Sequence, residues 1–571
     1  MLEATNKRSV QEMAVAALAA TAVAAEDEFQ PYVSGVADLM QKRMALTDES
    51  MFSLRGRALE CMGHMAIAVG KDAFEPYFVP TMQCALEGLA MDNTDLHEFA
   101  YAVFANLAKV MEQEFAPALN ELVPHLIQVI GTDEGQLEAV QDTEAETSAF
   151  DALDDSDDED GEGGNYVIQI RTALLEAKKG AITALGEMAA HSGAAFFPFL
   201  EESMKVLQNA AKNWHPLIKL EVADALPSLL APSIAAYDGG EIKWTKGEVN
   251  GNNPMSPQTT QVASAVLQQL IELMTDDDKD VVGKACEGAQ SVIELCGPHA
   301  LAPVTKELLT MTHELLNKKA PCQNMDNFAI LGDYGGDDDD DHDTFMQAVC
   351  DLLGSYPRVM GPQFAQYLPQ FLPAVCDWAK SSRPSSDRSM AMGCLSEIAQ
   401  ESGRDVGAHW DSVFLPAVLA GLADPDDNVK RNAAFCAGVC CESLGDSIAD
   451  KYPQLLQAIS PLFSVDISKS EASAACVDNA AAALSRMIMA CPNQIPMPQV
   501  LPALLKALPL KSDVTENPVV YKCLLGLIQG NHPDLAANKD ELKRVLTAAT
   551  AENSDVLEEI QVQIRPILTS L

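Results

Sequence analysis

The sequence has few basic residues, few aromatic residues and no long hydrophobic run. It holds 38 Lys or Arg residues against 83 Asp or Glu in 571, a formal net charge of −45. Such an excess of negative charge repels nucleic acid and attracts basic proteins. No apolar run reaches the roughly 18 residues that a transmembrane helix needs, so we expect no membrane span. Aromatic residues make up only 6% of the chain, but a hydrophobic content of 48% is ample for a core.

Catalytic and cofactor motifs are also missing. Gly70-Lys71 lacks the upstream glycine spacing of a phosphate-binding loop, no Gly-x-Ser-x-Gly occurs, and no histidine pairs with a nucleophile. No segment has the pattern of a β-strand, so the ligand crevices of parallel sheets are not expected either. We therefore expect no enzymatic activity, no cofactor and no metal ion.

The 14 cysteines lie in apolar helical stripes, which indicates reduced, buried thiols in a cytosolic or nuclear protein. Cys436, Cys440 and Cys441 are neighbours on one predicted helix. No histidine lies at metal-ligand spacing from them, so core packing is favoured over zinc. Residues 13–25 imitate the apolar part of a signal peptide, but Glu12 interrupts the start and alanine dominates, so we interpret the segment as a helix.

Residues 410–444 show how the chain is organised. Phe414, Val418 and Leu422 fall on one face of a predicted helix, and a tight acidic turn follows. Asp426 or Asp427 is expected to cap a second helix, whose apolar stripe runs from Val429 through Ala433, Cys436, Ala437 and Cys440 to Leu444. One such hairpin cannot bury both stripes, so it needs similar hairpins on either side.

The pattern does recur along the chain. First helices follow an aromatic residue or leucine beside a proline, and 45 residues separate Pro31 from Pro76 while 47 separate Pro369 from Pro416. This is the period of HEAT repeats, which are pairs of helices. The sequence predicts an all-α HEAT-repeat superhelical solenoid of about eleven hairpins, continuous over residues 1–571. Because it starts with a second helix that has no first-helix partner, we expect the C-terminal part of a longer protein.

Three segments interrupt the repeat. Residues 141–165 are predicted to form a solvated acidic loop, residues 238–256 a polar loop, and residues 320–342 a second acidic loop. Trp244, in the polar loop, is interpreted as a packing anchor rather than a binding site.

The two acidic loops contain the candidate binding residues. Neither has the glycine and glutamate spacing of an EF-hand, so calcium is not expected. Dense carboxylates favour docking of lysine-rich segments, although a plain solvating loop remains the alternative. Ser156, followed by acidic residues, is a candidate phosphorylation site. The candidate residues for binding a basic partner are Asp154, Asp155, Asp157, Asp158, Glu159, Asp160, Asp337, Asp338, Asp339, Asp340 and Asp341.

Several stretches resemble importin-β-type nuclear import receptors. Residues 171–207 are similar to the middle of these receptors, and residues 427–434 (DNVKRNAA) are similar to their commonest start of a second helix. Residues 483–511, which end in MPQVLPALLKALPLK, resemble the C-terminal region of the importin-four and importin-five members. The resemblance covers essentially the whole chain.

This resemblance implies a HEAT superhelix whose acidic face wraps basic import signals, including those of histones and ribosomal proteins. It also implies binding of phenylalanine-glycine nucleoporins, shuttling between cytoplasm and nucleus, and release of cargo by Ran. The resemblance implies that the Ran site lies mainly in N-terminal repeats, which we expect to lie outside this sequence. From the repeat itself, carboxylates of the second helices that lie off the apolar stripe are expected to add up to a negative groove.

Two other interpretations remain open. An acidic HEAT-repeat chaperone would shield basic proteins without transporting them. A HEAT scaffold of another kind would hold protein partners with no preference for basic tails. Solenoids perform all three roles, so the fold alone does not separate them.

Overall fold

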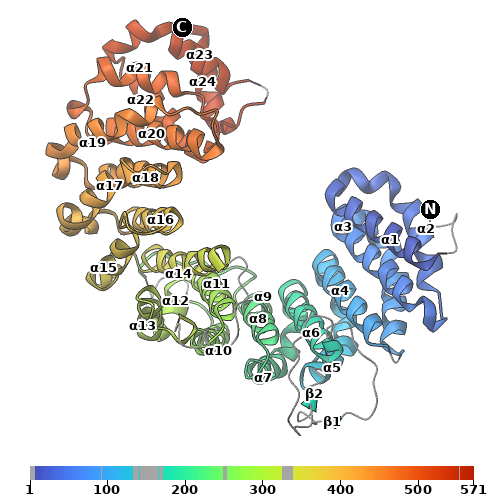
Figure 1. Cartoon of the computed structure of the whole chain (residues 1–571). Helices are drawn as coiled ribbons and strands as arrows, with labels where there is room; N and C mark the ends of the chain where they lie inside the picture. Colours follow the sequence, from blue (N-terminus) through green and yellow to red (C-terminus); the bar gives the residue numbers. More distant parts are fainter. Residues whose placement is uncertain are drawn as a thin grey trace, which may run out of the picture. The chain divides into compact units, whose positions relative to one another are not determined.

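The computed structural model describes residues 7–91, 93–132, 140–141, 166–167, 172–248, 254–323, 338–551 and 553–570. These residues are mostly helical (Figure 1). The chain divides into two compact units, one of residues 1–242 with 255–273, the other of residues 243–254 with 274–571. The expected continuity of one solenoid across both stays a prediction. None of the described helices is long and apolar enough to cross a membrane.

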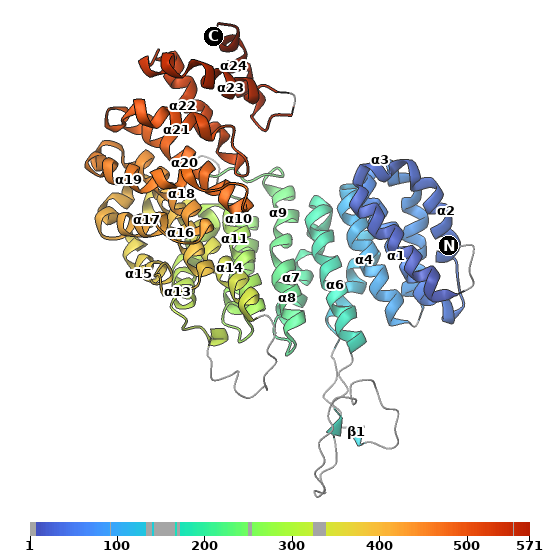
Figure 2. The same cartoon turned by 45° about the horizontal axis from the view of Figure 1, so that its top comes forward.

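The first unit is a row of helical pairs in which each second helix packs on the next. The second helix of each pair is the first half of α3, then α4, α6 and α8, and Figure 2 shows α4 and α6 side by side. The helices of this unit are α1 (Arg8–Ala25), α2 (Val33–Met44), α3 (Phe52–Leu89), α4 (Thr94–Met111), α5 (Leu119–Ile130), α6 (Thr172–His191), α7 (Leu200–Ala210), α8 (Pro216–Ala225), α9 (Leu230–Tyr237) and α10 (Pro257–Leu273).

The second unit repeats the same arrangement. Its second helices α11, α14, α16, α18, α20, α22 and α24 each contact the next in the series. The helices of this unit are α11 (Lys279–Cys296), α12 (Pro298–Leu301), α13 (Thr305–Leu316), α14 (Asp338–Met360), α15 (Leu368–Trp378), α16 (Ser385–Ser402), α17 (Leu415–Leu422), α18 (Asp427–Leu444), α19 (Tyr452–Ile459), α20 (Glu471–Ala490), α21 (Met497–Ala507), α22 (Asn517–Gln529), α23 (Lys539–Ala549) and α24 (Glu558–Ser570).

A sharp turn ends most second helices. At this point the backbone takes a positive φ, as at Gly403 (57°) and Gly445 (50°), and also at Glu26 and Glu112, which are not glycines. A 3₁₀ segment of seven residues then leads into the next first helix, for example Glu112–Ala118. Pro31 and Pro117 lie in this segment, and Pro369 and Pro416 lie in the first turn of the helix after it, where a missing N–H costs nothing. Pro76 instead lies inside α3.

The hairpin predicted over residues 410–444 is confirmed. Phe414, Val418 and Leu422 are buried, as is the whole apolar stripe of α18. Asp426 is the cap of α18, because its carboxylate accepts hydrogen bonds from the N–H groups of Asn428 and Val429 at 2.9 and 3.1 Å. A short π-helical turn over Trp410–Phe414 precedes α17, which periodicity did not predict.

The structure differs from the sequence analysis in three places. Two short strands, β1 (Val140–Gln141) and β2 (Tyr166–Val167), pair antiparallel at the ends of the first acidic insertion, where no strand was expected. The second insertion, predicted as a loop as far as residue 342, is helical from Asp338, where α14 begins. The sequence also predicts one second helix over residues 217–230, but α8 ends at Ala225, since Pro227 cannot donate a helical hydrogen bond, and a 3₁₀ turn leads into α9.

Candidate functional site

A cavity of about 370 Å³ opens on the face formed by the second helices α14, α16 and α18. Its polar lining includes Asp351 of α14, Glu397 of α16, Asn432 of α18 and Asp426, which caps α18. None of the described residues that line the cavity is Lys, Arg or His. The lining therefore carries carboxylate groups that no basic side chain of the lining neutralises. The apolar stripes of these helices are buried in the core instead.

The ionised forms of two carboxyl groups in the lining, Glu397 and Asp351, are disfavoured by their surroundings. The pKa of Glu397 is raised from its usual 4.5 to about 7, mainly by burial and also by the nearby carboxylates Asp351, Glu294 and Glu401, against the lowering effect of Arg358. Burial also raises the pKa of Asp351, although Gln347 donates a hydrogen bond to its Oδ1 at 2.6 Å and lowers it. Both carboxylates would be stabilised by a cation that enters the cavity.

Hydrogen bonds hold the walls of the cavity together. The side-chain amide of Asn432 in α18 donates to the backbone oxygen of Ser389 in α16 at 2.8 Å and to its hydroxyl at 3.1 Å. These bonds tie α16 to α18 in the cavity lining, so the spacing of its polar groups is set before any ligand arrives.

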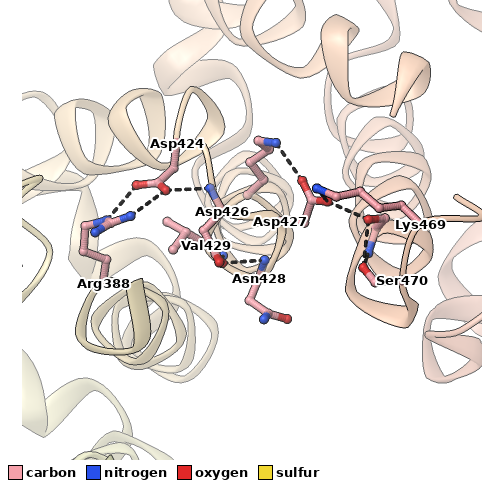
Figure 3. Close-up of polar contacts among 10 residues, drawn as sticks. Arg388, Asp424, Asp426, Asp427, Asn428, Val429, Lys469 and Ser470 are labelled. Carbon is pink, nitrogen blue, oxygen red and sulfur yellow. Dashed lines mark hydrogen bonds and ion pairs between the residues drawn. The ribbon is translucent and has the colours of Figure 1, made fainter. Parts of the chain in front are cut away.

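Charged residues at the helix N-termini brace the rim (Figure 3). Arg388 of α16 donates both arms of its guanidinium to Asp424, at 2.8 Å each. Burial alone would raise the pKa of Asp424, yet the bonds from Arg388 and from the Asp426 N–H hold it below its usual value. Asp427 accepts a hydrogen bond from Ser473 of α20 at 2.6 Å and lies 3.9 Å from Lys469. Three successive repeats are thereby linked.

The carboxylates continue beyond the cavity. Glu294 of α11 pairs with Arg358 of α14, and Glu401 of α16 lies 3.9 Å from the same guanidinium. In the first unit, Glu98 of α4 has a pKa raised first by burial and then by Glu176 of α6. Both units therefore carry acidic residues on the exposed face of their second helices, as the sequence predicted.

Most of the acidic residues predicted from the insertions cannot be compared with this site. Asp154, Asp155, Asp157, Asp158, Glu159, Asp160, Asp337 and the candidate phosphorylation site Ser156 lie outside the described residues. Asp338–Asp341 form the first turn of α14. Asp351 and Glu397 were not singled out from the sequence, because only the packing of α14 on α16 brings them together. Their signal was a carboxylate off the apolar stripe of each second helix.

The cysteine interpretation agrees with the structure. Cys436, Cys440 and Cys441 are buried with free thiols, and burial raises the pKa of Cys441 to about 12. Among the described residues, no group of three or more His, Cys, Asp or Glu side chains is arranged to hold a metal ion.

No protein-family model matches the chain. The probable importin subunit beta-4 of Schizosaccharomyces pombe is 27% identical over 573 residues, which cover 98% of this chain and 53% of that protein. Importin-4 of Homo sapiens is 26% identical over 587 residues, which cover 97% of this chain and 51% of that protein. The chain spans about half the length of the curated relatives it matches.

Solved structures have the same fold. The karyopherin Kap121p bound to the SUMO protease Ulp1p matches with a TM-score of 0.69 and 18% identity, over 100% of this chain and 52% of that one. Kap121p bound to Nup53p matches with a TM-score of 0.67 and 18% identity, over 100% of this chain and 50% of that one. The predicted all-α HEAT-repeat fold is confirmed. The resemblance to the importin-β family is confirmed as well, and its relatives are of the importin-4 and importin-5 type.

Proposed function

We propose that this chain is the cargo-binding segment of a nuclear import receptor. It binds basic, extended import signals, such as those of histones or ribosomal proteins, and escorts them through the nuclear pore between cytoplasm and nucleus. The observation that carries this proposal is the cavity between α14, α16 and α18. Its carboxylates, Asp351 and Glu397, are half-buried, and none of the lining residues that the structure describes is basic.

A lysine side chain suits this cavity. Its methylene stem is slender, and its ammonium group donates three hydrogen bonds to carboxylate and amide oxygens. Entry of the ammonium returns Glu397 to its ionised form and offsets the cost of its burial. Further lysines of the same segment then lie along the acidic face, where each contact is weak and sensitive to salt.

Other partners follow from the relatives. Because Kap121p is seen with Nup53p, we propose that phenylalanine-glycine nucleoporins are partners of this chain too. Any response to Ran is proposed to act mainly through sequence outside this chain. The acidic residues of both insertions are proposed to add to the negative field that attracts basic cargo. No step of this function requires catalysis.

The test measures binding of a lysine-rich peptide to the full chain. Replacing Asp351 with Asn and Glu397 with Gln should weaken binding by roughly tenfold or more, because the lysine then enters a cavity that no longer holds a carboxylate. The matched control replaces Glu201 and Glu202 with Gln, which removes the same charge from exposed positions on α7. Equal affinities for the two double variants would contradict the proposal.

A chaperone for basic proteins remains the second candidate, favoured by the same carboxylates. Binding of both a basic tail and a phenylalanine-glycine peptide, each measured across a salt series, supports the receptor. Binding of the tail alone supports the chaperone. Binding of neither leaves a scaffold of another kind.

A further inference from the structure

Residues 243–248 belong to the stretch of sequence between α9 and α10, but in the structure they contact other helices. They pack within the second unit against the ends of α11, α14 and α16, which belong to successive repeats. The segment contains neither helix nor strand. We call it the cis segment.

Trp244 anchors one end of the cis segment. Its indole Nε1 donates to the backbone oxygen of Glu294, in the last turn of α11, at 3.1 Å. The ring lies directly on Gly297, the residue that ends α11, where a Cβ atom would fall 2.3 Å from the ring. The interpretation of Trp244 as a packing anchor is therefore confirmed, and the shallow recess that receives the ring depends on this glycine.

Lys246 anchors the other end. Its ammonium group donates to the Glu401 carboxylate at 2.6 Å and to the Glu401 backbone oxygen at 2.7 Å. Glu401 lies in the last turn of α16, where carbonyl groups lack helical partners and the helix dipole favours a cation. The stem of Lys246 crosses Gly361, where a Cβ atom would lie 3.0 Å from the lysine Cγ.

The backbone between these side chains is also bound. The N–H of Gly247 donates to the backbone oxygen of Val359 at 2.8 Å, and the side-chain amide of Gln363 donates to the Gly247 oxygen at 2.6 Å. The segment turns at Lys246-Gly247, where the N–H of Glu248 donates to the backbone oxygen of Thr245 at 3.0 Å. Two side-chain anchors with main-chain hydrogen bonds beside them are how a peptide segment binds to a preformed surface. Lys243, Thr245, Lys246 and Glu248 are exposed, so the segment buries little apolar area of its own.

We propose that the ends of α11, α14 and α16 form a second peptide-binding site, occupied here by the chain's own cis segment. The ligand class is a segment with an aromatic residue and a lysine two positions later, followed by a turn like the one at Lys246-Gly247. A partner segment of this kind competes with residues 243–248 for Glu401 and for the recess at Gly297. This inference rests on the proposed function only in that such a partner is a basic import signal.

The site would thus be autoinhibited. A partner must compete with the cis segment, which is present at a high effective concentration because it belongs to the same chain. The partner therefore needs a higher affinity than it would for an empty site. A partner that displaces it also releases a contact that spans three repeats, α11, α14 and α16, and so frees these repeats to shift against one another.

The experiment supplies the segment in trans. Residues 243–248 of the full chain are replaced by a Gly-Ser sequence of equal length, and a labelled peptide of residues 241–248 is titrated into the replaced and the unchanged chain. The replaced chain should bind the peptide saturably, and the unchanged chain at least tenfold more weakly. Equal binding to both chains would overturn the proposal.

Two peptide variants test the anchors. The peptide with Lys246→Ala should lose most of its affinity for the replaced chain, whereas Thr245→Ala, at an exposed position between the anchors, should keep it. Comparable losses from both changes would also overturn the proposal. Should the replaced chain fail to fold, the Trp244→Ala/Lys246→Ala double variant of the full chain takes its place.

Failure of this proposal is distinguishable from failure of the proposed function. Binding of a lysine-rich peptide that lacks aromatic residues to the cavity at Asp351 and Glu397 should be the same in the replaced and unchanged chains. Loss of that binding in Asp351→Asn/Glu397→Gln, with trans binding of the cis segment kept, assigns the two sites to separate ligands.

Discussion

Glu397 of α16 lies so close to Gly354 of α14 that position 354 has no room for a methyl group. A Cβ atom there would fall 1.9 Å from the Glu397 Oε2 atom and 3.1 Å from its carboxyl carbon. The Glu397 carboxylate can therefore occupy this position only because residue 354 of the neighbouring repeat is a glycine. This contact fixes one wall of the candidate lysine cavity.

The first prediction is that Gly354→Ala displaces the Glu397 carboxylate and weakens binding of a lysine-rich peptide several-fold, as measured by calorimetry. Gly283→Ala is the matched control, because it adds the same methyl group to α11 at a position outside the cavity lining. A Cβ atom at 283 would lie 3.7 Å from the Phe345 ring, an ordinary contact. If both variants weaken binding equally, the close fit of Glu397 against Gly354 is not what positions the carboxylate.

The second prediction concerns the pH dependence of binding. Burial raises the pKa of Glu397 to about 7, whereas lysine stays protonated well above that pH. A lysine-rich peptide should therefore bind roughly tenfold more tightly at pH 8 than at pH 6, because the fraction of ionised Glu397 rises by about that factor. Glu397→Gln should flatten this dependence, in titrations with a peptide that contains no histidine. A slope that persists in the variant would contradict the assignment.

The third prediction concerns stability, and it has the opposite sign. Between the usual glutamate pKa of 4.5 and about 7, the folded chain keeps a proton on Glu397 that the unfolded chain has released. The contribution of Glu397 to the free energy of unfolding therefore falls as the pH rises through this window. Denaturant titrations of the Glu397→Gln variant should show a shallower decline over the same range. An unchanged decline would mean that Glu397 titrates normally in the folded chain.

The repeat could be predicted from the sequence because its cause is local. Apolar stripes at helical spacing and prolines near first helices are properties of single segments, and they placed α18 and its stripe correctly from Val429 to Leu444. The β1–β2 pairing was not predictable, since each strand has only two residues and its partner lies across an insertion. An alternating pattern of apolar and polar residues cannot be recognised in a strand of two residues.

The candidate site was predicted only in kind. Carboxylates on second helices predicted an acidic face, but the proximity of Asp351 to Glu397 depends on the relative axial position of α14 and α16. The cis segment was less visible still. It lies within residues 238–256, whose polar sequence predicted a loop, and only the fold shows Lys246 hydrogen-bonded to Glu401, 155 positions further along. Contacts of this kind require the tertiary structure.

The fourth prediction uses the turns that end second helices. Glu112 and Gly445 both have a φ of 50°, a region where residues other than glycine are strained. Glu112→Gly should therefore stabilise the fold by about 1 kcal/mol, and Gly445→Ala should destabilise it by a similar amount. A Cβ atom at 445 would meet nothing within 4 Å, so collisions do not contribute. Thermal unfolding measures both changes, and shifts of the same sign would show that φ is not what decides them.

The fifth prediction concerns a buried ion pair between repeats. Arg486 of α20 and Glu516 make two hydrogen bonds at 2.6 and 3.2 Å, and both residues are more than nine-tenths buried. Arg486 also lies over the Phe435 ring, 5.0 Å from its centre. Arg486→Met should cost about 3–5 kcal/mol of unfolding free energy, because it leaves the Glu516 carboxylate buried without a partner.

The double variant Arg486→Met/Glu516→Leu separates the value of the pair from the cost of breaking it. An apolar pair of similar volume carries no desolvation penalty, so the double variant should regain most of the stability lost in the single one. A double variant as unstable as Arg486→Met would instead assign the loss to the contact of Arg486 with Phe435 or to its hydrogen bond with Glu442, 3.2 Å away. Denaturant unfolding of the wild type, the two single variants and the double variant completes the cycle and gives the coupling energy directly.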